Sequence, residues 1–279
     1  MEENNFDSKV KEVKDKHKRK GFVKKGEILN NVVYKSENLI ITKEREGKGE
    51  LVILGTGYSL SIDENNRITH CDPFMKWPDL SVFRDDTTVL SIYFPFEAKG
   101  LKYAGKELCE FANSLPEGKN FILHSKCGVC IALTCGMLNE RANIVTISTP
   151  FRGTIIADQK VVFQRLNWIE RKIYKMIFNN HKVDRDITPS SKIIKKANYS
   201  ALKRHNHINV ISTCPNNGTK LIDKLLCFLD NKLSIQGDGI VSVESQTIAA
   251  AYTIKVTVTH ASSLAEAVIG VRKYCMPLI

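Results

Sequence analysis

Three side chains of this sequence, Ser125, Asp238 and His260, could together perform nucleophilic acyl chemistry. A serine hydroxyl becomes a nucleophile when a histidine takes its proton and a carboxylate holds that histidine in the correct tautomer. The three residues occur in the order serine, acid, histidine. A serine on a strand-to-helix turn needs its partners in that order, after later strands. We therefore take this set as the candidate catalytic centre.

Ser125 has the local context of a nucleophile elbow. The segment His-Ser-Lys-Cys-Gly at 124–128 directly follows an apolar strand and precedes a helix rich in small residues. A tight turn there would expose the hydroxyl above the sheet edge, and the following helix N-terminus would favour developing negative charge. The usual elbow has glycine two residues on either side of the serine, where this chain has Leu123 and Cys127.

The acid and the histidine are each expected at the carboxyl end of a strand. Asp238 lies in GDGIVSVESQ and His260 in VTVTHASSL. Open parallel sheets place their sites at this edge. Taken singly, Asp238 could be a turn residue before glycine and His260 a helix N-terminal residue, so only their joint occurrence with Ser125 indicates a catalytic set.

The elements that must position these residues follow from the hydrophobic pattern. Residues 31–57 predict strands that meet in hairpin fashion, and the last of them, 51–54, is a central strand that ends in Gly-Thr-Gly. From Thr88, apolar β-type runs alternate with helical ones, and this alternation resumes at Ile208 after an interruption over 155–205. We expect one mostly parallel sheet of about eight strands with flanking helices and a last helix from Ser262 to about Cys275.

Four stretches in this order resemble the α/β-hydrolase superfamily, particularly its lipase-like and esterase-like members, over roughly residues 36–275. VILGTG resembles the family's first central strand and oxyanion loop, and HSKCG resembles its elbow. TISTPFRGT resembles a lipase-type strand end, and GDGIVSVESQ resembles the acid loop. Leu54 and Phe151 stand where the family motifs have histidine.

The resemblance implies a serine hydrolase that cleaves a carboxylic ester through an acyl-enzyme, without metal or organic cofactor. It implies a Ser125–His260–Asp238 triad. The oxyanion hole would use the backbone N–H groups of Thr56 and Lys126, with Gly55 and Gly57 shaping the loop. Removing one such donor costs about 3 kcal/mol of transition-state stabilisation. Because the donors are backbone groups, we expect the side chains of Thr56 and Lys126 to be replaceable. An acyltransferase or thioesterase on the same triad, and a non-catalytic binding module of this fold, are the alternatives.

Cysteine and histidine clusters suggest other chemistry. Cys127 and Cys130 form a CxxC pair at a strand-to-helix junction, the place of a thioredoxin-like redox pair. A zinc site from His124 and these two thiols lacks a second ligand pair at a suitable spacing. His205 and His207 could share a strand face and bind metal, although ordinary surface histidines are the commoner case.

The insertion is strongly basic and is expected to form a helical cap. Residues 160–204 contain twelve Lys or Arg against three Asp or Glu. Apolar side chains recur there at helical spacing and predict packing onto the cap's other helices; they are Val162, Leu166, Ile169, Ile173 and Met176. Interleaved aromatic residues suit an anionic lipid surface or an anionic acyl substrate, whereas nucleic acid is disfavoured because no nucleic-acid-binding motif is present.

Length and composition suit one large domain. The chain has 279 residues, 43% of them hydrophobic, and a net charge of +11. No apolar run suits a membrane span or signal segment, and eight irregularly spaced cysteines suggest reduced thiols, so we expect a cytoplasmic protein. We predict a charged, flexible arm over 1–28 and the α/β-hydrolase domain over 29–279, with the cap at 155–205.

Overall fold

The computed structural model describes residues 21–72, 75–116, 118–178, 181–215, 220–249, 252–262 and 264. Most of the arm predicted over 1–28 and most of the predicted last helix, from Ser262 to Cys275, lie outside the described residues.

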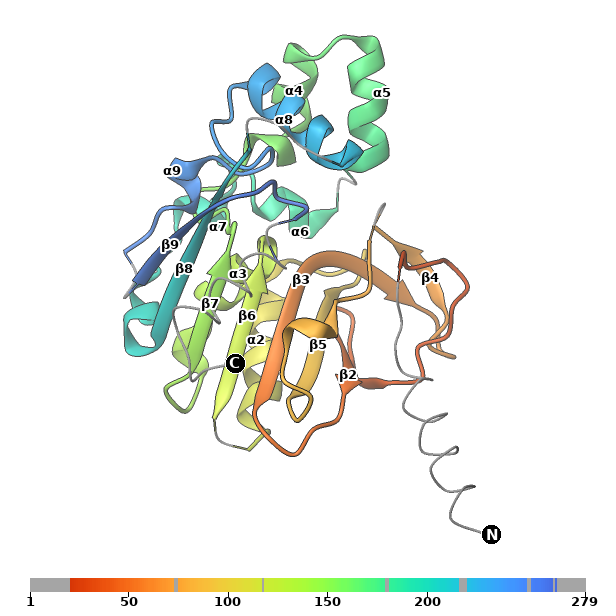
Figure 1. The fold of residues 1–279 in the computed structure, drawn as a ribbon, viewed down its shortest axis with the longest axis vertical. Coiled ribbons are helices and arrows are strands. Elements are labelled where there is room, and N and C mark those ends of the chain that lie inside the picture. Colours follow the sequence, from red (N-terminus) through yellow and green to blue (C-terminus); the bar gives the residue numbers. More distant parts are fainter. Residues whose placement is uncertain are drawn as a thin grey trace.

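A mixed sheet forms the centre of the molecule (Figure 1). In the described part of the chain it has nine strands, in the order β1-β2-β5-β3-β6-β7-β8-β9, and β4 pairs with β3 at the side of this path. Every pair from β5 to β9 along the path is parallel. The bounds are β1 Val32–Lys35, β2 Ile40–Arg45, β3 Leu51–Ile62, β4 Ile68–Cys71, β5 Thr88–Phe94, β6 Lys119–His124, β7 Asn143–Ile147, β8 Asn206–Thr213 and β9 Tyr252–Thr257.

The predicted mostly parallel α/β fold is confirmed, with two differences in the sheet. The sheet has one strand more than predicted, because β4 folds back and pairs antiparallel with the second half of β3. In addition, β1 and β2 form the expected antiparallel hairpin, but β2 and β3 do not, because β5 lies between them, antiparallel to β2 and parallel to β3. β2 and β3 therefore both pair with a segment about forty residues further along the chain, which local turn signals do not reveal.

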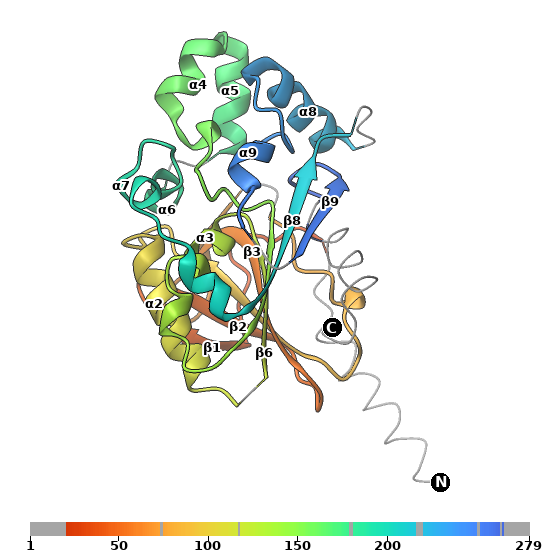
Figure 2. The same ribbon diagram turned by 90° about the vertical axis from the view of Figure 1, so that its left-hand side faces the viewer.

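Continuously apolar strands bury both faces of the sheet. On β3, Ile53 packs into the core beneath α2 and α3, whereas Val52 and Leu54 point into the core on the opposite face. β6 alternates in the same way. Two-sided burial is typical of parallel strands covered by other elements on both faces. Figure 2 shows α2 and α3 together on one side of the sheet. This packing fixes the strand ends at which the candidate residues lie.

Helices flank the sheet and extend beyond the carboxyl ends of its strands. Between β7 and β8 the chain forms a helical insertion, α4 to α7, bordered by two short 3-10 helices at 155–157 and 200–204. Together with α8 it lies above the sheet in Figure 1. The bounds are α2 Leu101–Asn113, α3 Lys126–Ala132, α4 Gln159–Arg165, α5 Trp168–Ile177, α6 Lys182–Asp186, α7 Lys192–Lys195, α8 Leu221–Leu233 and α9 Val243–Gln246.

The single helical stripe expected at the start of the insertion is split between α4 and α5. Asn167 caps α5 through a reciprocal capping box with Glu170, which ends the preceding helical path. Val162 and Leu166 are buried, but Ile169 is exposed; the side chains of Ile173 and Met176 lie outside the described part. The buried pair packs against α8, which follows the insertion, rather than only against other cap helices. None of the described helices is long and apolar enough to cross a membrane.

Candidate active site

Ser125 occupies the sharp turn between β6 and α3. Its backbone has φ 56° and ψ −130°. A positive φ is costly for a residue with a side chain and persists where the surroundings enforce it, often at functional sites. The Ser125 N–H donates to the Ile147 carbonyl at the end of β7, at 2.8 Å. The strained turn leaves the Ser125 side chain at the carboxyl edge of the sheet.

The turn forms although Leu123 and Cys127 replace the usual glycines, because Gly55 on β3 provides the space. Gly55 pairs directly with Leu123 across the sheet. A Cβ on Gly55 would lie 2.6 Å from the Cys127 Cβ and 2.8 Å from a methyl carbon of Leu123. Gly57 packs closely against Ser125 in the same way: its φ is 82°, and a Cβ there would lie 2.9 Å from the Ser125 Cβ. β3 does not end at Gly-Thr-Gly, as the sequence predicts, but continues through these residues to Ile62, so the strand itself passes directly against the turn.

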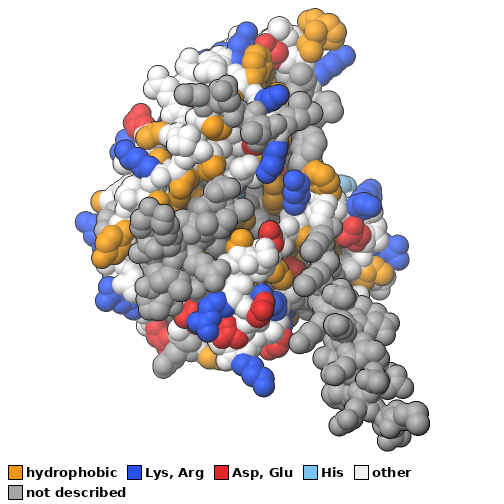
Figure 3. Space-filling view, viewed as in Figure 1, with side chains coloured by type: hydrophobic (Ala, Val, Ile, Leu, Met, Phe, Trp, Pro, Cys, Tyr) orange, Lys and Arg blue, Asp and Glu red, His pale blue; other side chains and the backbone are white. Residues whose placement is uncertain are grey.

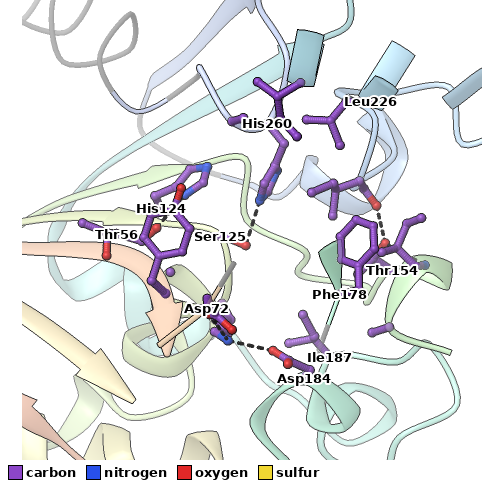
Figure 4. A pocket seen from close by; sticks show the side chains of 18 of the residues that line it. Thr56, Asp72, His124, Ser125, Thr154, Phe178, Asp184, Ile187, Leu226 and His260 are labelled. Atoms are coloured by element: carbon purple, nitrogen blue, oxygen red, sulfur yellow. Dashed lines mark hydrogen bonds and ion pairs between the residues drawn. The ribbon is translucent and has the colours of Figure 1, made fainter. Parts of the chain in front are cut away.

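His260 contacts both of its expected partners (Figure 4). Its Nε2 lies 2.9 Å from the Ser125 Oγ, and its Nδ1 lies 2.8 Å from the Asp238 Oδ2. An ionised carboxylate only accepts hydrogen bonds, so Nδ1 carries the proton and Nε2 is left to accept one from the serine hydroxyl. The Asp238 side chain is fully buried and that of His260 is 8% exposed. Residues 125, 238 and 260 thus form one continuous hydrogen-bonded chain.

The buried carboxylate of Asp238 has backbone partners for its second oxygen. Oδ1 accepts from the N–H groups of Ile240 and Val241, at 3.0 and 2.8 Å. The backbone carbonyl of Asp238 accepts from the His260 N–H at 2.8 Å. Such partners satisfy the remaining hydrogen-bonding capacity of the buried carboxylate. They also fix the distance between the two loops that carry the acid and the base.

Two further residues, which sequence reasoning missed, brace the acid loop. Asp230, at the end of α8, accepts from the N–H groups of Gly237 and Gly239 at 2.8 and 3.2 Å. The buried Gln246 accepts from the Ser212 N–H at 2.7 Å and donates to the carbonyls of Ser212 and Val241. Neither residue has a local sequence signal, because each acts on backbone that is brought to it only by the fold.

His124, the residue before Ser125, contacts both Thr56 and His260. Its Nδ1 donates to the Thr56 carbonyl at 2.9 Å, and its ring lies 4.4 Å from the ring of His260, measured between centroids. Burial, reinforced by the neighbouring His260, lowers the pKa of His124 to about 3. The ring is therefore neutral and serves as a fixed hydrogen-bond donor that holds the Thr56 peptide of β3.

Thr56 and Lys126, the two residues expected to supply oxyanion donors, line the same cavity as Ser125. Thr56 follows Gly55 on β3 and is held by His124. Lys126 is the first residue of α3. The first N–H groups of a helix have no acceptor within the helix. The fold therefore brings both backbone segments to the cavity that Ser125 lines.

The Lys126 side chain, expected from the sequence to be replaceable because the expected oxyanion donor is a backbone group, is buried in a charged cluster. Its Nζ lies 2.7 Å from the Asp184 Oδ1 on α6, donates to the Ser59 Oγ at 2.9 Å, and lies 4.0 Å from Asp72. The Lys126 side chain is 5% exposed. Burial alone would lower the pKa of Lys126, but the carboxylates of Asp184 and Asp72 outweigh it and raise the pKa. The cluster ties the insertion to the elbow.

The cavity above Ser125 lies between the sheet edge, the insertion and α8. Figure 4 shows Ser125 and His260 on one side and Phe178, Ile187 and Leu226 facing them, with Asp184 and Asp72 below. Most of its remaining wall is apolar and comes from the insertion, α8 and the acid loop; this part comprises Ile156, Ala157, Tyr174, Phe178, Ile187, Ile222, Leu226 and Ile240. The site therefore offers an apolar chamber with a polar floor next to Ser125.

The CxxC pair lacks the properties of a redox centre. Cys127 and Cys130 are completely buried. Burial raises the pKa of Cys127 to about 12 and raises the pKa of Cys130 well above its usual value. A redox pair needs an accessible thiol with a lowered pKa. These thiols pack as small apolar side chains in the core beneath α2 and α3.

His205, just before β8, and His207, on β8, are both buried. The expectation that they are ordinary surface histidines is therefore wrong. His205 accepts from the Ala142 N–H at 3.2 Å and contacts the Cys135 carbonyl, and His207 contacts the Thr146 hydroxyl at 2.8 Å. Burial lowers the pKa of His207 to about 4. Among the residues that the structure describes, no group of three or more His, Cys, Asp or Glu side chains is arranged to hold a metal ion.

Comparison with known proteins identifies the fold. No protein-family model matches the chain, and no curated protein matches its sequence. Among solved structures it is similar to the mature form of the Bacillus licheniformis lipase BlEst2, with a TM-score of 0.55 and 12% identity, over 86% of this chain and 98% of that one. The propeptide form of that lipase gives a TM-score of 0.53 at 12% identity, over 86% of this chain and 53% of the other. The chain has the α/β-hydrolase fold.

Proposed function

We propose that the chain is a serine hydrolase that cleaves a carboxylic ester through an acyl-enzyme. The observation that carries this proposal is the hydrogen-bonded chain from the Ser125 Oγ through both ring nitrogens of His260 to the buried Asp238. The fold alone would allow many functions. A serine in a strained turn, aligned with a correctly oriented base, is the arrangement that acyl transfer requires.

In the first step Ser125 attacks the ester carbonyl as His260 Nε2 takes the hydroxyl proton. Asp238 holds the Nδ1 proton and stabilises the imidazolium that forms. The backbone N–H groups of Thr56 and Lys126 would receive the carbonyl oxygen as it becomes negatively charged. His260 then gives its proton to the leaving alcohol, and the acyl group remains on Ser125.

In the second step water attacks the acyl-enzyme with His260 again acting as base, and the carboxylic acid leaves. The apolar chamber suits the hydrocarbon part of a small-molecule or lipid-like acyl substrate. The same groups could act on a thioester, or pass the acyl group to an alcohol instead of water. The aligned triad argues against a purely binding role. The seven described cysteines are free thiols, which fits the cytoplasmic location that we include in the proposal.

The proposal is tested with nitrophenyl esters of graded acyl length and with matched oxygen and sulfur esters. Wild type should hydrolyse at least one ester, and Ser125→Ala should reduce kcat at least about a thousandfold. Ser114→Ala, at an exposed serine on the end of α2, is the matched control and should leave kcat unchanged. A preference for the thioester, or product shifted to an added alcohol, would reassign the reaction to a thioesterase or an acyltransferase. Equal activity of wild type and Ser125→Ala would refute the proposal.

A further inference from the structure

The outward side of α5 combines basic and apolar side chains. Trp168, Arg171, Lys172 and Lys175 recur at helical spacing and share one side of the helix, and all four are exposed. Trp168 is 65% exposed, and Ile169 beside it is 51% exposed. Lys172 lies over the Trp168 ring at 4.9 Å. We call these five residues the outer face of α5.

Acidic side chains are absent from the outer face of α5. The one acid of this helix, Glu170, points to the inner side, where its side chain is 13% exposed, pairs with Lys232 of α8 at 3.5 Å and accepts from the Asn167 N–H. Its charge is thus compensated inside the molecule. Figure 3 shows hydrophobic and basic side chains together at the upper end of the molecule, over α5. The outer face of α5 therefore presents uncompensated positive charge around a large aromatic side chain.

The opposite side of the same helix belongs to the cavity. Tyr174 is buried, donates to the Ile156 carbonyl and lines the cavity together with Phe178, which follows α5. One helix thus has an exposed basic and aromatic side and a second side that forms the wall of the candidate active site. A partner bound to the outer face of α5 would lie next to the substrate chamber.

We propose that the outer face of α5 binds the protein to an anionic phospholipid surface. Lysine and arginine gain from the negative potential of such a surface, and tryptophan is favoured at the boundary between headgroups and acyl chains. Burying Trp168 and Ile169 in that boundary removes apolar area from water, which basic residues alone would not achieve. Nucleic acid would satisfy the charges and could stack on Trp168, but it offers no apolar phase to Ile169.

The surface is independent of the reaction proposed for Ser125, and the two claims can fail separately. Vesicle binding should be the same for wild type and Ser125→Ala. Conversely, loss of the outer face of α5 should leave hydrolysis of a soluble short-chain ester unchanged, because none of its residues contacts the triad.

The test is co-sedimentation of the full chain with vesicles of phosphatidylcholine alone and of phosphatidylcholine mixed with phosphatidylserine. Wild type should bind only the anionic vesicles, and added salt should weaken the binding. Lys172→Gln with Lys175→Gln should reduce the partition coefficient about 25-fold, since each basic residue contributes about fivefold, equivalent to about 1 kcal/mol. The matched control is Lys102→Gln with Lys106→Gln on α2, two exposed lysines far from α5.

Fluorescence gives an independent readout, because the chain has only two tryptophans and the other, Trp77, is buried. Anionic vesicles should shift the emission to shorter wavelength in wild type, and Trp168→Phe should abolish the shift. Equal loss of binding in the α2 control would mean diffuse charge attraction and would overturn the proposal. So would binding to RNA with no binding to vesicles, or no binding at all.

Discussion

The buried pair between Lys126 and Asp184 gives a stability prediction that can be worked out from the structure. Lys126→Met would leave the Asp184 carboxylate, which is 20% exposed, without the ammonium group that now lies 2.7 Å away. Removing one partner of a buried ion pair costs about 3–5 kcal/mol, because the remaining charge stays desolvated. The partial exposure of Asp184 places the expected cost at about 3 kcal/mol, toward the lower end of that range.

Asp184→Asn is the complementary change and should cost less. The Lys126 ammonium group would keep the Ser59 hydroxyl at 2.9 Å and the Asp72 carboxylate at 4.0 Å. We expect about 1–2 kcal/mol for this variant. The double variant should be less destabilised than the sum of the two single variants, with a coupling energy of about 1–2 kcal/mol. The cost of Lys126→Met corresponds to a fall in Tm of roughly 6–12 °C.

Urea unfolding of the four proteins measures these free energies, and ester hydrolysis reports on the site. Since the proposed oxyanion donor is the Lys126 backbone N–H, a folded Lys126→Met variant should retain chemistry on a small ester. Its KM should rise, because α6 loses its link to the elbow. If Lys126→Met lowers the free energy of unfolding by less than about 1 kcal/mol, or if the losses of the two single variants are additive in the double variant, Lys126 and Asp184 do not form a desolvated ion pair.

Three further predictions concern the packing and titration of the site. Gly55→Ala should destabilise the protein by about 1–3 kcal/mol and lower kcat/KM, because the new Cβ meets the Cys127 side chain. Adding Cys127→Gly should restore part of both losses. A Tm equal to that of wild type in Gly55→Ala would contradict this packing. The folded chain keeps His124 and His207 neutral with pKa values lowered to about 3 and 4, so the unfolded chain takes up their protons first as the pH falls below about 6.5. The free energy of unfolding should therefore fall as the pH is lowered from about 6.5 to about 4, and in His207→Gln it should fall less steeply with pH. If the pH dependence of this variant equals that of wild type, His207 is not a buried neutral side chain in the folded protein. Iodoacetamide should leave Cys127 and Cys130 unmodified in the folded protein, as mass spectrometry of peptides would show, because both thiols are buried with raised pKa values; rapid alkylation would reopen the redox interpretation.

The sequence was sufficient for the alternation of strands and helices from β5 to β7 and from β8 to β9, and for the convergence of Ser125, Asp238 and His260. This success has a simple cause. In a parallel sheet the carboxyl ends of the strands meet at one edge, so residues that directly follow strands become neighbours without knowledge of the tertiary contacts. The nucleophile turn, in contrast, is made possible by Gly55, a residue from another strand, and local spacing around Ser125 could not reveal that compensation.

Other features depend on contacts between distant segments. β5 separates β2 from β3, and Asp184 reaches Lys126 from the insertion; neither follows from a local pattern. One missed feature did have a signal. Asn167 followed by Glu170 has the spacing of a helix N-cap with its reciprocal partner, and it marks the start of α5. The apolar stripe had suggested a single helix across this point.

The identity of the nucleophile is tested most directly by labelling with a fluorophosphonate followed by mass mapping of the modified peptide. The proposed mechanism predicts one adduct, on Ser125, that forms rapidly in wild type and in Ser114→Ala. It predicts no adduct in Ser125→Ala and much slower labelling in His260→Ala, where the base is missing. Labelling that persists in Ser125→Ala, or an adduct that maps to another residue, would contradict the assignment of Ser125 as the nucleophile.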